Sequence, residues 1–517
     1  MSSKIYPIGI QNFEKIRTDG YFYIDKTALI YQMVKTGSYY FLSRPRRFGK
    51  SLLISTLEAY FLGKKELFEG LAMEKLEKDW ITYPIFHMDL NTEKYDTRES
   101  LDSILNFTLE KWEQQYGTAP SETTFALRFR GLIERAYKQT GQRVVILIDE
   151  YDKPMLQAIG NEELQKEFRN TMKAFYSVLK TMDGCIQFAF LTGVTKFGKV
   201  SVFSDLNNLD DISMRNQYID ICGVSEKELH DDLEIELHEL ADIKGVSYHE
   251  ICDKLREYYD GYHFTHNSIG IYNPFSLLNT FKYKEFGSYW FETGTPTYLV
   301  ELLKKHHYDL RRMAHEETSI SVLNSIDSAS DNPIPVIYQS GYLTIKEYDR
   351  DFQIYTLAYP NKEVRKGFIE SLMPAYVHLP ARENTFYVVS FIKDLRVGNL
   401  DQCMERIKSF FASIPNDMNN KEEKHYQTIF YLLFRLMGQY VDAEVKSAVG
   451  RADVVIKMQE AIYVFEFKVD GTPEEALAQI NSKQYAIPYQ ADHRKVIKVG
   501  VNFDSSTRTI GEWIIEN

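Results

Sequence analysis

The sequence predicts an α/β protein with more than one domain. The chain has 517 residues, which is more than one hydrophobic core usually holds. Over residues 1–225, short apolar runs alternate with helical patterns, as is typical of a parallel sheet covered by helices on both faces. Near the C-terminus, strand-like runs lie between two helical patterns, which predicts a second α/β domain.

Four apolar runs are the predicted strands of the first domain. The third run, Val144–Ile148, is apolar at every position, as expected for a strand that is buried on both faces. Helical patterns over Leu52–Phe61 and Glu162–Leu179 are predicted to cover the sheet. The four predicted strands are Tyr39–Leu42, Ile85–Leu90, Val144–Ile148 and Ile186–Leu191.

Composition excludes several classes of protein. Hydrophobic residues make up 44% and charged residues 26%, so the chain is not disordered as a whole. The net charge of −12 argues against nucleic acid coating the whole surface, although a local basic groove stays possible. The 4 cysteines include no Cys-x-x-Cys pair, which argues against a zinc knuckle or a disulfide framework. No apolar run is long enough to span a bilayer, so we expect a cytoplasmic protein without a membrane partner.

The first predicted strand leads into a loop that ends in Gly49-Lys50-Ser51, and an apolar helix follows. Backbone N–H groups of such a loop bind phosphate oxygens, and the helix dipole favours negative charge there. Lys50 would reach the β- and γ-phosphates, Ser51 would bind Mg²⁺, and Gly49 would let the backbone approach closely. The predicted nucleotide-binding residues of this loop are Arg46, Arg47, Phe48, Gly49, Lys50, Ser51 and Leu52.

The loop departs from the pattern Gly-x-x-x-x-Gly-Lys-Ser/Thr at its first position, where Arg44 stands. Pro45 also stiffens the loop, so the turn is expected to be built differently, and ATP hydrolysis is left open. Two interpretations of Arg46 and Arg47 remain: they complement the charge of a triphosphate, or they belong to a patch that faces nucleic acid.

Two further strand ends carry polar residues that suit a nucleotide site. Asp149 and Glu150 follow the buried strand Val144–Ile148, where Asp149 would hold Mg²⁺ through water and Glu150 would polarise the attacking water. The alternative is a strand that ends in two solvated acids. Thr192 follows the strand Ile186–Leu191 and would sense the γ-phosphate, or it simply caps the strand.

These segments, together with Asp25-Lys26-Thr27, closely resemble the bacterial AAA-ATPase-like proteins. The resemblance rests on Phe41–Ser51, Ile148–Pro154 and Leu191–Val194. It implies a P-loop NTPase of the ASCE type over residues 1–225 and ATP as the ligand. Arginine at the first P-loop position is usual in that family. P-loop relatives often form rings, so a homo-oligomer is compatible with the resemblance.

A second group of charged residues lies near the C-terminus. The runs Ala452–Ile456 and Ile462–Phe467 predict two strands joined by a short polar turn. Glu466 and Lys468 are two apart and share a face, whereas Phe467 points to the opposite face; Asp453 lies near the start of the first strand. Two carboxylates suit Mg²⁺, which activates water toward a phosphodiester, and Lys468 would orient that water or stabilise developing charge. The alternative is a cross-strand salt bridge on a solvated face.

The flanking pattern extends this group. A predicted helix over Lys421–Met437 and a strand over Ala443–Val445 precede it, and Thr472-Pro473-Glu474-Glu475 is a capping box that opens a helix. The whole segment resembles the PD-(D/E)XK nuclease superfamily, in the form commonly fused to the AAA-ATPase-like module. By that resemblance Asp453 and Glu466 bind metal, Lys468 is catalytic, and Gln479 assists substrate or water. Glu423, Glu444 and Tyr485 also match, and Glu444 and Tyr485 are either functional or structural.

The organisation that follows has three parts: an AAA-ATPase-like P-loop domain over 1–225, a helical lid or winged-helix-like region over 226–385, and a PD-(D/E)XK nuclease-like domain over 386–517. In the middle part, His263 and the pair His306-His307 lack carboxylates at ligand spacing, which argues against a metal site. Arg215 is either a nucleotide-sensing arginine or part of a surface salt bridge.

Two hypotheses for function remain from the sequence. The first is an enzyme, an ATPase and Mg²⁺-dependent nuclease, in which ATP regulates cleavage or processing of a nucleic acid, with DNA as the favoured partner. The alternative is an ATP-dependent switch or scaffold whose C-terminal domain binds nucleic acid or a protein partner without cleaving.

Overall fold

The computed structural model describes residues 4–197, 208–292, 297–306, 308–323, 332–377, 381–414, 423–437, 442–445 and 453–517. The chain forms two compact units. Unit 1 consists of Met1–His306 and Glu316–Val364, and unit 2 of His307–His315 and Arg365–Asn517. The division of the chain into three domains at residues 225 and 385 stays a prediction.

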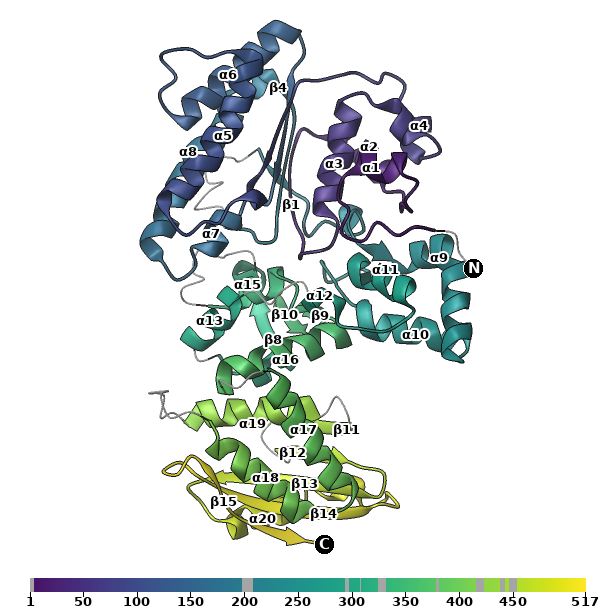
Figure 1. The fold of residues 1–517 in the computed structure, drawn as a ribbon, viewed down its shortest axis with the longest axis vertical. Helices are drawn as coiled ribbons and strands as arrows, with labels where there is room; N and C mark the ends of the chain where they lie inside the picture. The colour runs from purple at the N-terminus through teal and green to yellow at the C-terminus, as the bar shows by residue number, and fades with distance from the viewer. Residues whose placement is uncertain are drawn as a thin grey trace. The chain divides into compact units, whose positions relative to one another are not determined.

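Unit 1 is built on a five-stranded parallel sheet in the order β2-β3-β4-β1-β5 (Figure 1). Strand β4 lies between β1 and β3, so the carboxyl ends of these three strands share one edge of the sheet. Every residue of β3 is buried, as its continuous apolar run predicts. The strands are β1 (Tyr39–Ser43), β2 (Ile85–Asp89), β3 (Val144–Asp149), β4 (Ile186–Gly193) and β5 (Asp210–Asp211).

Helices cover both faces of this sheet. In Figure 1, α5, α6 and α8 lie on one side of the strands and α1 to α4 on the other. Helix α8 buries residues at helical spacing, and its Phe175 stacks on Phe129 of α6 at 4.6 Å between ring centroids. The predicted α/β class with a parallel sheet is therefore confirmed. These helices are α1 (Phe13–Thr18), α2 (Thr27–Thr36), α3 (Lys50–Phe61), α4 (Ala72–Leu76), α5 (Arg98–Tyr116), α6 (Phe125–Thr140) and α8 (Glu162–Thr181).

The remainder of unit 1 is a helical layer with a small sheet. Helices α9 (Glu226–Lys244), α10 (Tyr248–Tyr259) and α11 (Pro274–Tyr283) share one hydrophobic core. The sheet is antiparallel, in the order β8-β10-β9, and is formed by β8 (Glu316–Ser319), β9 (Thr344–Asp349) and β10 (Ile354–Ala358). The sequence did not indicate this sheet, because its strands have only four to six residues and none is a continuous apolar run. Most of the loop predicted over Ser325–Asn332 lies outside the described residues.

Unit 2 contains a mixed five-stranded sheet in the order β11-β12-β13-β14-β15. The β13–β14 pair is parallel and the other pairs are antiparallel. The crossover from β13 to β14 includes α20 (Pro473–Ser482), which begins with the predicted capping box and with proline in its first turn. The strands are β11 (Asp442–Val445), β12 (Val454–Lys457), β13 (Ala461–Val469), β14 (Lys495–Asp504) and β15 (Thr509–Glu516).

Strand β13 divides its side chains between two cores. Val464 packs with Ile480 of α20 and with Tyr485. Phe467 points to the opposite face, where its ring centroid lies 4.7 Å from that of Phe430 on α19 (Glu423–Met437). This alternation is the period of two expected for a strand between two helical layers. It places Glu466 and Lys468 on the α20 side. Within the described part of the chain, no helix is both long and apolar enough to cross a membrane.

Candidate functional site

The loop between β1 and α3 has the geometry of a phosphate-binding loop. Gly49 adopts a left-handed conformation with φ of 96°, and α3 begins at Lys50. The Lys50 side chain is buried, and its Nζ donates to the main-chain oxygens of Arg44 at 3.1 Å and Pro45 at 3.3 Å. The same Nζ lies 3.5 Å from Oε1 of Glu150. The loop therefore holds one ammonium group between its own carbonyls and an acid at the end of β3.

Asp149 and Ser51 meet where β3 ends and α3 begins. Asp149 is 3% exposed, and burial raises its pKa to about 6. The charge of Glu150 contributes to this rise, whereas a hydrogen bond from Ser51 opposes it. A buried carboxylate beside a hydroxyl fits Mg²⁺, which takes oxygen ligands and would neutralise the charge that burial disfavours. Ser51 and Asp149 are thus the residues that would hold this ion.

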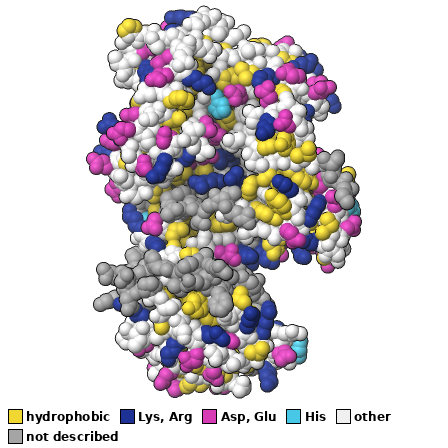
Figure 2. All heavy atoms as spheres, in the orientation of Figure 1, with side chains coloured by type: hydrophobic (Ala, Val, Ile, Leu, Met, Phe, Trp, Pro, Cys, Tyr) yellow, Lys and Arg dark blue, Asp and Glu magenta, His cyan; other side chains and the backbone are white. Residues whose placement is uncertain are grey.

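A cavity of about 390 Å³ opens beside the loop. Among the described residues that line it, Arg46, Arg47, Lys50 and Lys153 are basic, and Glu150 is acidic. Figure 2 shows Lys and Arg side chains gathered in a hollow of unit 1. Apolar residues form another wall: Pro7, Ile8, Ile10, Pro274, Phe275 and Leu278. Basic and apolar side chains thus line the same cavity, which suits a ligand that carries several negative charges and an apolar ring.

Most predicted nucleotide-binding residues line this cavity, but Phe48, Asp149 and Thr192 do not. Ser51 and Leu52 line it together with the basic residues of the loop. The Phe48 ring is buried against Tyr262 and Phe264, at 4.8 and 5.8 Å between centroids, so only its backbone is left for a ligand. Thr192 is fully buried at the end of β4, and its Oγ1 has no hydrogen-bond partner within the described structure.

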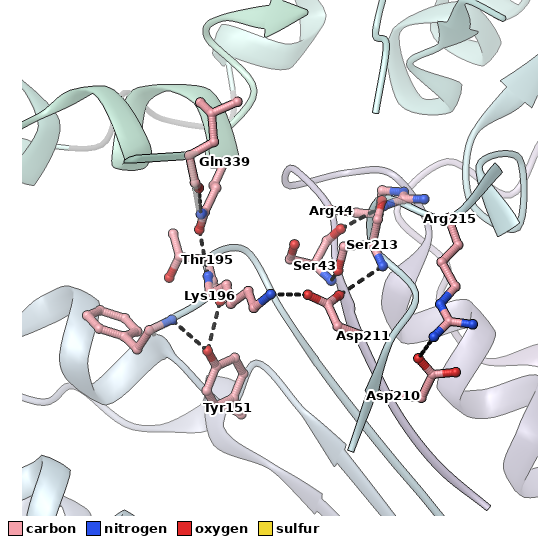
Figure 3. Close-up of polar contacts among 12 residues, drawn as sticks. Ser43, Arg44, Tyr151, Thr195, Lys196, Asp210, Asp211, Ser213, Arg215 and Gln339 are labelled. Atoms are coloured by element: carbon pink, nitrogen blue, oxygen red, sulfur yellow. Dashed lines mark hydrogen bonds and ion pairs between the residues drawn. The ribbon is translucent and has the colours of Figure 1, made fainter. Parts of the chain in front are cut away.

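Arg44 does not line this cavity, and Figure 3 shows it beside Ser43 and Ser213. Its guanidinium is buried, where Nη1 donates to the main-chain oxygens of Ser43 at 2.9 Å and Ser213 at 2.8 Å, and Nη2 donates to that of Tyr218 at 3.1 Å. It also lies 3.9 Å from the centre of the Phe264 ring. Burial lowers the pKa of Arg44 to about 10. The arginine that replaces the first P-loop glycine is therefore an internal cation that ties the loop to later segments.

Arg215 forms an ion pair with Asp210, and more than half of its side chain is exposed. This agrees with the surface salt bridge that the sequence offered as one interpretation of Arg215. Figure 3 draws the pair beside the Arg44 cluster.

The predicted C-terminal residues converge on one face of the unit 2 sheet. The main-chain N–H of Phe467 donates to Oδ2 of Asp453 at 3.0 Å, and that of Asp453 donates to Oε2 of Glu466 at 3.3 Å. The Gln479 amide on α20 donates to Glu466 and accepts a hydrogen bond from Lys468. Its nitrogen also lies 3.3 Å from the Tyr485 hydroxyl.

The two carboxylates of this group repel each other. Glu466 is 3% exposed, and burial together with the charge of Asp453 raises its pKa to about 7. No group of three or more His, Cys, Asp and Glu side chains suited to a metal occurs in the described parts of the chain. Mg²⁺ binds proteins through one or two carboxylates and keeps several waters, so the Asp453–Glu466 pair fits it. Glu423 is the first residue of α19, and Glu444 of β11 lies opposite Val455 of β12 in the sheet. The side chains of Glu423 and Glu444 lie outside the described structure.

The comparisons with known proteins match the two segments that contain these groups. Residues 7–203 match the family described as predicted AAA-ATPase, and residues 421–513 match the PD-(D/E)XK nuclease superfamily. The resemblance on both segments is thereby confirmed: the chain joins an AAA-ATPase-like domain to a PD-(D/E)XK nuclease domain.

One curated relative matches along the whole chain. It is described as an uncharacterized protein in the vnfD 5′ region of Azotobacter chroococcum mcd 1, and it is 37% identical over 529 residues, which cover 100% of both chains. The chain belongs to the same family as this protein. A solved structure of the Aeropyrum pernix ORC2 protein (ADPNP-ADP complexes) covers 78% of this chain and 95% of its own, at 11% identity. Its TM-score of 0.23 is too low to support an argument.

Sequence reasoning missed Lys153 and Asn91, which both line the cavity of unit 1. A signal existed for Lys153, because it follows Asp149-Glu150 by only three residues. Asn91 carried no such signal, since it follows β2 in a short turn far from either motif.

Proposed function

We propose that the chain binds ATP with Mg²⁺ in unit 1, cleaves DNA at a divalent-cation site in unit 2, and uses the nucleotide to control cleavage. The convergence of Asp453, Glu466 and Lys468 around Gln479 carries this proposal. Three charged groups and one amide, from β13, α20 and the residue before β12, form a chemical site rather than a solvated salt bridge, because Glu466 is buried and Gln479 bonds to both Glu466 and Lys468.

The charges of the unit 1 cavity support ATP as its ligand. Arg46, Arg47 and Lys50 would bind the phosphate oxygens, and Ser51 with Asp149 would hold Mg²⁺. Glu150 lies next to Lys50 and would accept a proton from the attacking water. The apolar residues that line the same cavity suit a nucleobase.

In unit 2, the proposed roles follow from the contacts. Asp453 and Glu466 would hold a divalent cation, which supplies charge neutralisation at the phosphodiester and makes water a stronger nucleophile. Lys468 would stabilise negative charge that develops on the phosphate. Gln479 positions both Lys468 and Glu466 through its single amide. The Tyr485 hydroxyl would help to orient the Gln479 amide, because it accepts a hydrogen bond from the amide nitrogen.

The test is a cleavage assay with plasmid DNA, Mg²⁺ or Mn²⁺, and ATP present or absent. The wild-type protein should convert supercoiled plasmid to nicked or linear product, with a rate that differs between the two nucleotide conditions. Lys468→Ala should lose cleavage but still bind ATP, and Lys495→Ala, an exposed lysine of β14, should keep both activities. Cleavage that persists in Lys468→Ala would overturn the proposed site. Nucleotide-dependent DNA binding without any product would instead favour a switch or scaffold.

A further inference from the structure

We propose that Lys153 is a second catalytic lysine of the nucleotide site, which contacts the γ-phosphate and stabilises its charge during hydrolysis. The inference rests on the proposed ATP binding and goes beyond it, because it assigns to this same chain the cation that many P-loop enzymes receive from a partner. Four observations support it: the path of the chain after β3, the contacts of Lys153, the charges around it, and the side from which it enters the cavity.

After β3, Glu150 and Lys153 line the cavity, and the two residues between them are buried. Tyr151 is buried, and its main-chain N–H donates to the oxygen of Thr192 at 3.0 Å. Asp152 is also buried and accepts hydrogen bonds from the main-chain N–H groups of Val194 at 3.2 Å and Thr195 at 2.6 Å. These hydrogen bonds connect the turn after β3 to the end of β4. Glu150 and Lys153, on either side of the two buried residues, line the cavity.

Asn91 holds the ammonium group of Lys153. Nζ of Lys153 donates to the main-chain oxygen of Asn91 at 2.5 Å and to its Oδ1 at 2.9 Å. Asn91 is itself fixed, because its N–H donates to Oδ1 of Asp89 at 2.8 Å at the end of β2. The hydrogen bonds of the lysine side chain thus go to neutral oxygens, while the carboxylates of Glu150, Asp89 and Glu93 act on its charge from nearby. A donor on Nζ remains for a ligand.

The electrostatics suit an anion. Burial lowers the pKa of Lys153, and the charge of Arg46 lowers it too, whereas the charges of Glu150, Asp89 and Glu93 raise it; the net shift is downward. A further negative charge beside Lys153 would relieve the repulsion between Lys153 and Arg46. Lys50 and Arg46 approach the cavity from the phosphate-binding loop, whereas Lys153 enters it from the turn after β3, beside Glu150. A γ-phosphate between the two sides would contact cations from both.

The proposed step is hydrolysis of the terminal phosphoryl group. The oxygen of water forms a bond to the γ-phosphorus, and the bond from that phosphorus to the β,γ-bridging oxygen breaks. ADP leaves with the electron pair, inorganic phosphate is released, and Glu150 takes the proton of the water. Charge builds up on the γ-phosphate oxygens and the bridging oxygen during this step, where Lys153 would stabilise it.

A consequence is that one chain supplies all the proposed catalytic groups of the nucleotide site, including the cation at the γ-phosphate. Enzymes that receive this cation from a partner gain roughly 10³- to 10⁵-fold in rate when the partner binds. If Lys153 fills the role, the ATPase rate per chain will not depend on a second copy. The proposal therefore predicts a rate per chain that stays constant on dilution.

The experiment measures ATP affinity and steady-state ATPase rate for the full chain and its variants. Lys153→Ala and Lys153→Gln should lower kcat by about 10²- to 10³-fold and change the Kd for ATP by less than about tenfold. Asn91→Ala should lower kcat by less, because the lysine remains but is no longer held. Lys166→Ala, an exposed lysine on α8, is the matched control and should behave as wild type. Lys153→Gln keeps a polar side chain without the positive charge and guards against a folding defect.

The outcomes separate the two proposals. A wild-type protein that neither binds nor hydrolyses ATP would overturn the proposed function itself. A wild-type protein that hydrolyses ATP, with Lys153→Ala and Lys153→Gln within about threefold of it, would overturn only the role of Lys153. A mixture of Lys153→Ala with Glu150→Gln should stay inactive, because each chain lacks part of its own set. Activity restored in that mixture would show that the cation acts between chains and would contradict the inference.

Discussion

The two sites of this chain use buried carboxylates in opposite surroundings. In unit 1, Asp149 has a pKa of about 6 and lies beside a cavity with four basic side chains. In unit 2, Glu466 has a pKa of about 7 and faces Asp453, with Lys468 as the cation bonded through Gln479. The first site is positive before any ion binds, whereas the second is a pair of acids that an added cation would neutralise. We therefore expect unit 1 to depend mainly on its own cations and unit 2 mainly on a bound metal.

The largest effect expected is at Lys468. Lys468→Ala removes the positive charge beside Glu466 and should lower the cleavage rate by about 10²- to 10³-fold, because one group that stabilises developing charge contributes this much. Plasmid cleavage at saturating Mn²⁺ measures the change. Lys495→Ala is the control, and equal cleavage by both variants would contradict the role of Lys468.

The matching variant in unit 1 is Lys50→Ala. Loss of one charge-assisted contact to phosphate should weaken ATP binding by about 10- to 100-fold. Titration with a fluorescent ATP analogue measures the affinity, and Lys65→Ala, an exposed lysine after α3, is the control. The comparison between the sites predicts that cleavage of DNA without ATP is unchanged in this variant. Unchanged ATP affinity would remove Lys50 from the site.

Arg44 separates stability from ligand binding, because it stabilises the phosphate-binding loop without lining the cavity. Arg44→Ala would leave the carbonyls of Ser213 and Tyr218 without their donor and should lower the free energy of unfolding by about 3 kcal/mol. Arg215→Ala, which breaks an exposed ion pair, should change it by less than about 1 kcal/mol. Urea denaturation measures both. Equal, small effects would mean that the buried guanidinium does not stabilise the loop.

The smallest effect expected is in the pH dependence of metal binding. The folded-state pKa of Glu466, about 7, lies above its ordinary value of 4.5, so stability falls as pH rises between these values. A divalent cation offsets this loss only when Glu466 is ionised. Mn²⁺ should therefore raise the melting temperature at pH 8 but not at pH 5.5, and EDTA should reverse the shift. Glu466→Gln should abolish it, whereas a shift of the same size at both pH values would contradict the assignment.

Local sequence predicted much of the fold and of both sites. The strands β1 to β4 and β12 to β13 follow from apolar runs, and the carboxyl ends of parallel strands brought Lys50, Asp149 and Glu150 together as expected. The alternation of side chains along β13 likewise separated Glu466 and Lys468 from Phe467. In these cases, one or two neighbouring elements determine the geometry.

Tertiary contacts explain what the sequence did not reveal. Arg44 is stabilised by carbonyls at Ser213 and Tyr218, which are 169 and 174 residues away in the chain. Lys153 is held by Asn91, 62 residues earlier, in the short turn that follows β2. The sheet β8-β10-β9 consists of short strands whose pairing spans a long segment. No local pattern encodes such partners, because they depend on how distant segments pack.

The most direct test of the account is a count of divalent-ion sites by Mn²⁺ titration, with and without a non-hydrolysable ATP analogue. The account predicts one ion site that does not need nucleotide and is lost in Glu466→Gln, and a second that appears with nucleotide and is lost in Asp149→Asn. A single class of sites, or the loss of both sites in either variant, would contradict the claim that two independent groups of carboxylates each hold an ion.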